Sequence, residues 1–195
     1  MAATATAIAG QAREPFRFTR QLYYRMGEAG IFEGVRVELL DGEIIRMSPQ
    51  SVPHAGTITR FTEALITALR RLFTLRVQLP VVLGNDSEPE PDFAVCDRDP
   101  DHYLRGHPTP QQVHLVVEVA FTSVDYDRGL KQAAYARAGI PVYWLVNLPD
   151  KVIEVYTEPD QAMGLYGRTE LRRAGDRLEL PGGATLEARD LLPPA

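Results

Sequence analysis

The segment from Val113 to Ala120, which reads VHLVVEVA, constrains the fold more than any other part of the chain. It is short, apolar and rich in β-branched residues, as is typical of a strand buried on both faces. Glu118 interrupts the run near its C-terminal end. An ionised carboxylate inside an apolar strand costs several kcal/mol unless a positive group meets it. The segment therefore requires either a metal ion or a basic side chain next to Glu118.

A helix is predicted from Asp125 to Gly139, directly after this strand. Ser123 or Asp125 can cap its start, and Gly139 is suited to its C-terminal end. Lys131 lies in the early part of this helix, and only two of the 21 basic residues of the chain are lysines. Because the helix must pack back against the sheet, Lys131 is the candidate basic partner of Glu118.

Composition limits the kind of protein. A chain of 195 residues with 45% hydrophobic and 24% charged residues is typical of a globular protein, and we expect one domain over residues 1–195. The net charge of −5 argues against bulk attraction to nucleic acid. It does not exclude a nuclease, because the carboxylates of a metal site add negative charge that bound cations offset.

The single cysteine and the first residues indicate in which cellular compartment the protein is expected. Cys96 alone allows neither an internal disulfide nor a cysteine zinc site, which indicates a reducing cytoplasm. Residues 1–14 lack the basic and apolar regions of a signal peptide, and they are predicted to be a flexible tail. We expect no membrane span, and we expect the core of the fold over about residues 35–156.

The remaining pattern predicts an α/β protein. Thr19 is a candidate cap for a short helix, and Asp41-Gly42 is a strong turn signal for a hairpin within residues 35–48. Apolar residues then recur at helical spacing from Pro53 onward, with His54 at the start of that apolar stripe. Further strands are predicted at 76–84, 93–96, 142–147 and 152–156, with a C-terminal antiparallel extension at 165–173 and 177–180.

Asp92 supplies a second carboxylate at a strand end. It follows a proline-stiffened turn and opens the apolar run Phe93 to Cys96. If this strand lies antiparallel to the strand of Glu118, the two carboxylates converge at one end of the sheet. Two converging carboxylates with open positions suit Mg²⁺ or Mn²⁺. Lys131 could then stabilise negative charge that develops on a phosphoester.

Each of these residues also has a structural interpretation. Asp92 could be a turn residue, Glu118 could pair with an arginine, and Lys131 could form a surface pair with Asp127. Taken singly, these interpretations are the more common. Taken together, Asp92, Glu118 and Lys131 favour a metal-dependent hydrolytic site.

The ordered motifs ELLDGEI, PDFAV, HLVVEV and DRGLKQAAYARAGIPVYWLV, between Val35 and Tyr156, resemble the Uma-two (Uma2) family. These are restriction endonucleases of the PD-(D/E)XK nuclease superfamily. The resemblance implies a restriction-endonuclease-like core with a central mixed sheet flanked by helices. It also implies Mg²⁺ (or Mn²⁺) held by Asp92 and Glu118. The lysine of the superfamily, usually at the position of Ala120, matches Lys131 here.

The resemblance implies a Mg²⁺-dependent endonuclease that hydrolyses the phosphodiester bonds of DNA by metal-activated water. Its catalytic residues would be Asp92, Glu118 and Lys131. The accessory candidates are Glu38, His54 and Tyr135. The alternative is a non-catalytic interaction or regulatory protein on a nuclease scaffold.

We expect DNA as the substrate and a homo-oligomer, since a two-fold dimer suits the cutting of both strands. The segment 97–112 is expected to border the substrate cleft. Scattered arginines are candidate DNA contacts. They are Arg60, Arg70, Arg71, Arg128 and Arg137.

Overall fold

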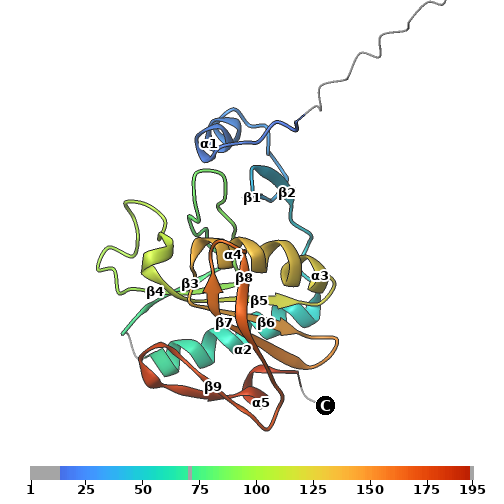
Figure 1. Ribbon diagram of the computed structural model, residues 1–195, viewed down its shortest axis with the longest axis vertical. Helices are drawn as coiled ribbons and strands as arrows, with labels where there is room; N and C mark the ends of the chain where they lie inside the picture. The colour runs from blue at the N-terminus through green and yellow to red at the C-terminus, as the bar shows by residue number, and fades with distance from the viewer. Residues whose placement is uncertain (1–13, 70–71, 194–195) are drawn as a thin grey trace, which may run out of the picture.

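A six-stranded mixed sheet with the order β3-β4-β5-β6-β7-β8 forms the centre of the protein (Figure 1). The computed structural model describes residues 14–69 and 72–193, so the predicted tail, apart from Glu14, lies outside the described residues, as do Arg70 and Arg71. The strands are β3 (Thr74–Val77), β4 (Phe93–Cys96), β5 (Val113–Ala120), β6 (Val142–Asn147), β7 (Val152–Asp160) and β8 (Leu165–Arg172). The predicted α/β fold with a central mixed sheet is therefore confirmed.

The strand pairing places the predicted metal ligands at one end of the sheet. β4 lies antiparallel to β5, and Phe93 pairs with Val117. β5 and β6 are the one parallel pair among the described strands of this sheet. Parallel neighbours need a crossover connection. A helical segment therefore has to connect β5 to β6 over one face of the sheet. This segment begins close to the end of β5 where Glu118 lies.

This crossover consists of three helical pieces in succession. They are α3 (Val124–Tyr126), a π-helical turn η2 (Asp127–Lys131) and α4 (Gln132–Ala138). Gly139 follows with a φ of 76°, the left-handed conformation that ends a helix at low cost. The predicted helix over this region is confirmed, with a π turn inside it. Such turns occur frequently at functional sites.

Along β5, successive side chains point to opposite faces of the sheet, and this alternation determines which of them contact the crossover helix. Leu115, Val117 and Val119 pack with the apolar residues of α2 (Val52–Leu69), whereas Val116 and Ala120 pack on the opposite face with Tyr135. Because successive side chains of a strand point to opposite faces, Glu118 shares the face of Val116 and Ala120. Figure 1 shows α2 and α4 on opposite sides of the sheet. Glu118 thus faces the helix that carries Lys131.

The N-terminal part forms a separate unit beside the sheet. It contains α1 (Arg20–Glu28), capped by Thr19, and a hairpin of β1 (Val37–Leu40) and β2 (Glu43–Arg46). Asp41 and Gly42 both have positive φ, as the turn signal predicts. Glu88, which is buried, accepts a hydrogen bond from Arg20 Nε at 2.5 Å and another from the Tyr24 hydroxyl. These bonds attach α1 to the segment before β4.

Two predicted strands differ in the structure. β3 ends at Val77, because Gln78 has a φ of 52° and Pro80 lacks a donor for the ladder. Residues 165–172 join the central sheet as β8, beside β7, and so do not form part of a separate extension. The C-terminal antiparallel extension is the smaller hairpin of β9 (Arg177–Glu179) and β10 (Thr185–Glu187).

Short helices complete the fold. Within the described residues, 3₁₀ turns occur at η1 (Pro110–Gln112) and η3 (Pro181–Gly183), and a short helix, α5, at Ala188–Leu191. The hairpin of β9 and β10 and the helix α5 cover the same face of the sheet as α2, because Leu178, Leu180 and Leu191 belong to the same apolar cluster as Phe61. Among residues 14–69 and 72–193, no helix combines the length and the apolar character needed to cross a membrane.

Candidate metal and hydrolytic site

Asp92 and Glu118 lie side by side at the ends of β4 and β5. The backbone N–H of Asp92 donates to Glu118 Oε2 at 3.4 Å, and the N–H of Val119 donates to Asp92 Oδ2 at 2.8 Å. Both side chains are buried. The structure thus brings together the two carboxylates that the sequence pattern suggests as metal ligands.

Lys131 reaches the same place from the crossover helix. Its Nζ lies 2.9 Å from Glu118 Oε1 and 3.2 Å from Glu38 Oε2, and the residue is only 4% exposed. Lys131 therefore does not form a surface pair with Asp127. The basic partner of Glu118 is this lysine and not an arginine. Tyr135 lies one helical turn further on, and its hydroxyl donates to Glu118 Oε1 at 2.7 Å.

Glu38 of β1 is also part of the site. It is 3% exposed and accepts hydrogen bonds from the backbone N–H of Glu90 at 3.1 Å and from the Tyr126 hydroxyl at 3.3 Å. Together with its contact to Lys131, these bonds connect the N-terminal hairpin to the end of the central sheet. Glu43, the other acidic residue of the hairpin turn, pairs instead with exposed Arg17.

His54 contacts the site through Asp92. His54 Nε2 lies 3.1 Å from Asp92 Oδ2, and Gln78 Nε2 donates to Asp92 Oδ1 at 3.1 Å. Burial works to lower the pKa of His54, but the hydrogen bond and charge of Asp92 and the charge of Asp127 raise it above its ordinary value. The imidazole therefore lies in direct contact with one of the two candidate metal ligands. Its Nδ1 is buried and has no hydrogen-bond partner among the described residues.

Asp127 is a site residue that the sequence suggests only as a surface partner of Lys131. It is 4% exposed, it lines the same pocket, and it accepts a hydrogen bond from Ser123 Oγ at 2.6 Å. The four-residue spacing between Asp127 and Lys131 is the signal that could have indicated a shared site. That spacing places two residues on one helix face but does not say which face meets the sheet.

Burial makes the negative charge of this site costly. It raises the pKa of Glu118 to about 8 against the opposing effect of Lys131, and it raises the pKa of Asp127 to about 6 against Lys131 and Ser123. Although Lys131 is buried, the charges of Glu118, Glu38 and Asp127 raise its pKa well above the usual value. Four buried carboxylates thus surround one buried ammonium group. They are Glu38, Asp92, Glu118 and Asp127.

These groups line a pocket of about 390 Å³. Its walls come from the hairpin, the 47–51 segment and the loop after β5, and none of residues 97–112 lines it. The expectation that the 97–112 segment borders this cleft is therefore wrong. Among the described residues, Arg36 and Arg46 are the arginines that line the pocket. Arg128 pairs with Glu154, and Arg137 pairs with Asp41.

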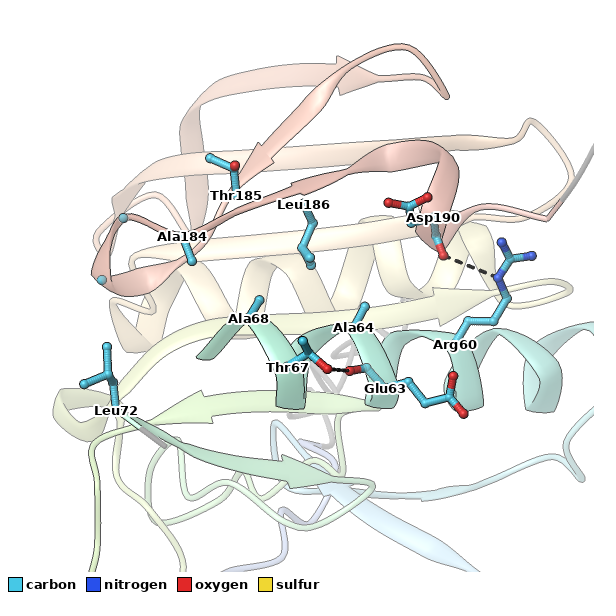
Figure 2. A pocket seen from close by; sticks show the side chains of 12 residues that line it. Arg60, Glu63, Ala64, Thr67, Ala68, Leu72, Ala184, Thr185, Leu186 and Asp190 are labelled. Atoms are coloured by element: carbon cyan, nitrogen blue, oxygen red, sulfur yellow. Dashed lines mark hydrogen bonds between the residues drawn. The ribbon is translucent and has the colours of Figure 1, made fainter. Parts of the chain in front are cut away.

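A second cavity, of about 940 Å³, lies between α2 and the C-terminal hairpin (Figure 2). Arg60 lies at one end of the lining residues, beside Asp190, and donates from Nε to the backbone oxygen of Asp190 at 3.4 Å. Its acidic side chains, Glu63 and Asp190, are exposed. None of the described residues that line this cavity is a buried carboxylate or a buried lysine, so it lacks the groups of the candidate hydrolytic site.

The comparisons with known proteins agree with this fold. A crystal structure described as that of "a putative nuclease belonging to DUF820 from Anabaena variabilis ATCC 29413" matches with a TM-score of 0.63 and 16% sequence identity. The match covers 80% of this chain and 88% of that chain. The fold is thus one also found in a protein described as a nuclease.

The sequence places the chain in a family. The profile of the Uma2 family, described as "Putative restriction endonuclease", matches residues 20–191, and the chain belongs to this family. A comparison with curated proteins finds no match. Membership of this family supports a nuclease activity, and the resemblance found from the motifs is confirmed.

Proposed function

We propose that this protein is a Mg²⁺-dependent (or Mn²⁺-dependent) endonuclease of the PD-(D/E)XK type that hydrolyses the phosphodiester bonds of DNA. The observation that carries the proposal is the contact of Lys131 Nζ with Glu118, immediately beside Asp92, at the floor of a pocket. A lysine next to two strand-end carboxylates combines a cation site with a donor for a phosphate oxygen.

The residues present fit a hard divalent cation. Asp92 and Glu118 offer carboxylate oxygens, which Mg²⁺ and Mn²⁺ prefer, and the buried negative charge exceeds what Lys131 offsets. Among the described residues no three histidine, cysteine or acidic side chains converge closely enough to hold a metal ion by themselves. Two protein carboxylates, with water and substrate oxygens, match the way Mg²⁺ is usually bound.

When bound, the divalent cation would supply Lewis-acid polarisation of the phosphate and lower the pKa of water. Lys131 would donate a hydrogen bond to a non-bridging phosphate oxygen and offset the charge that develops there. Its raised pKa keeps it protonated, so its role is electrostatic stabilisation and not proton abstraction. Tyr135 would orient Glu118, and His54 would orient Asp92, through their hydrogen bonds.

Glu38 would hold Lys131 together with Glu118. Its contact with Nζ at 3.2 Å fixes the ammonium between two carboxylates, so the lysine cannot rotate freely away from the pocket. Since Glu38 comes from the N-terminal hairpin, we propose that this hairpin contributes to the site and not only to the fold.

A cleavage assay tests the proposal against the alternative of a non-catalytic scaffold. Supercoiled plasmid, linear duplex DNA and single-stranded DNA would be incubated with the protein in Mg²⁺, Mn²⁺, Ca²⁺ or EDTA. We expect cleavage with Mg²⁺ or Mn²⁺, none with EDTA, and none with Asp92→Asn in any metal. Glu63→Gln, which changes an exposed carboxylate in the other cavity, is the matched control and should cleave normally. DNA that stays intact under every condition would favour the non-catalytic scaffold.

A further inference from the structure

Apolar side chains line part of the site pocket, in addition to its buried acidic groups. Phe121 follows directly after β5 and lines the pocket, and it is 42% exposed. The preceding residues of the strand, from Leu115 to Ala120, are almost entirely buried. Three further apolar side chains line the pocket from the hairpin side. They are Ile45, Met47 and Pro49.

Polar groups on the same side are available to a ligand. Ser48 and Gln50 line the pocket, and both are exposed. Arg46, also exposed, lines the pocket and forms no ion pair with any residue that the structure describes, whereas Arg36 pairs with Glu90 at 2.8 Å. An aromatic ring, amide and hydroxyl groups and a free guanidinium are the groups that proteins use to bind an unpaired nucleotide.

The depth of the reactive groups restricts the substrate. Asp92, Glu118 and Lys131 are 8%, 3% and 4% exposed, so a phosphate must enter the pocket to reach them. A pocket of about 390 Å³ is in the range that takes a small ligand. It can take a nucleotide whose base has left the stack, but not the paired bases that flank a phosphate in a duplex.

Charge also disfavours an intact duplex. Binding of duplex DNA depends on basic groups that neutralise many phosphates, and this chain has a net charge of −5. Stacking on an aromatic ring needs no such basic surface, and it tolerates any base because every base has a π face. Phe121 can therefore supply attraction that the overall charge does not.

We propose that the pocket binds a single-stranded or locally unpaired segment of nucleic acid, with a base stacked on Phe121 and the adjacent phosphate at Lys131. The proposal rests on the proposed nuclease function for the role of Lys131. It goes beyond that function because it defines the substrate class and a specificity residue, Phe121, which does not take part in the chemistry.

Binding measurements test this inference separately from cleavage. Fluorescence anisotropy would be recorded in Ca²⁺ with labelled oligothymidylate, with oligouridylate and with a DNA duplex of the same length. We expect one or both single strands to bind at least about tenfold more tightly than the duplex. The comparison of the two single strands identifies DNA or RNA as the preferred source of the unpaired nucleotide.

Variants of Phe121 test the stacking contact. Phe121→Ala should weaken single-strand binding about tenfold, whereas Phe121→Trp should retain it. Phe16→Ala is the matched control, because Phe16 is 71% exposed and does not line the pocket. Circular dichroism would confirm that each variant is folded.

The outcomes separate the inference from the proposed function. Equal affinity for duplex and single strands, or unchanged binding by Phe121→Ala, would overturn the inference even if DNA is cleaved. Tight, Phe121-dependent binding of a single strand without cleavage in Mg²⁺ or Mn²⁺ would support the inference and overturn the nuclease function.

Discussion

Lys131 Nζ and Glu118 Oε1 are 2.9 Å apart, although 13 residues separate them in the chain and both side chains are about 95% buried. The contact exists because β5 turns Glu118 toward the crossover helix and the π turn directs Lys131 back to the sheet. Desolvation of two charges costs more than a typical ion pair returns. A pair this deep is therefore weak evidence for stability and better evidence for function.

Lys131→Met should abolish most cleavage, by about 100-fold or more, because the donor to the phosphate oxygen is lost. It should also destabilise the protein by about 3 kcal/mol, because the buried carboxyl groups of Glu118 and Glu38 lose their ion pairs with Nζ. Lys131→Arg should fail to restore activity, since a planar guanidinium is wider than the ammonium group that the site holds. Cleavage rates and urea unfolding curves measure both effects.

The other lysine of the chain provides the control for this prediction. Lys151 is exposed in the turn between β6 and β7, and Lys151→Met should leave cleavage unchanged. Activity of Lys131→Met close to the parent rate would remove Lys131 from the catalytic set. Activity of Lys131→Arg close to the parent rate would show that any cation suffices at this position.

Asp92→Asn and Glu118→Gln should each weaken Mn²⁺ binding strongly, because each removes one of the two proposed carboxylate ligands. Isothermal titration calorimetry measures the affinity, and thermal melts check that the variants remain folded. Glu63→Gln, in the cavity of Figure 2, should bind Mn²⁺ as the parent does. Parental affinity in both site variants would place the metal elsewhere.

Most of the fold can be predicted from the sequence. The apolar run from Val113 to Ala120 coincides with β5, and the Asp41-Gly42 turn joins β1 to β2. Both signals are local, since one rests on β-branched composition and the other on positive φ. The sequence does not identify β8 as part of the central sheet, because most residues of β8 are exposed and their pattern does not indicate a partner strand.

The candidate site can be predicted from the sequence only in part. Asp92, Glu118 and Lys131 stand out because a polar residue in an apolar strand or a rare lysine is visible in the sequence. The position of Glu38 depends on how the hairpin docks against the segment before β4, through Glu88. Such docking is a tertiary property, and no periodicity in the hairpin encodes it.

His54→Ala should lower the affinity for Mn²⁺ by about 10-fold to 100-fold, because His54 orients Asp92 through the 3.1 Å contact of Nε2. His54→Gln, whose amide can donate to the same carboxylate, should recover part of the affinity. Calorimetry on both variants separates the orienting role from a loss of packing at the start of α2. Equal affinity in the alanine variant and the parent would show that Asp92 needs no such partner.

Asp127→Asn should stabilise the metal-free protein, and more so at high pH. Burial raises the pKa of Asp127 from 3.8 to about 6, so the folded state favours the protonated form. The associated stability is fully present below pH 3.8 and is lost as the pH rises through about 6. Asparagine carries no charge and avoids this loss.

The advantage of Asp127→Asn over the parent should grow by about 1 kcal/mol between pH 5 and pH 8 when unfolding is measured in EDTA. Ser123→Ala is the companion variant, because Ser123 Oγ donates to Asp127 Oδ2 and supports the ionised form. Its loss should raise the pKa of Asp127 further and destabilise the protein, more at pH 8 than at pH 5. A stability difference between Asp127→Asn and the parent that does not change with pH would show that Asp127 is ionised at no cost, with the charge of Lys131 fully compensating its burial.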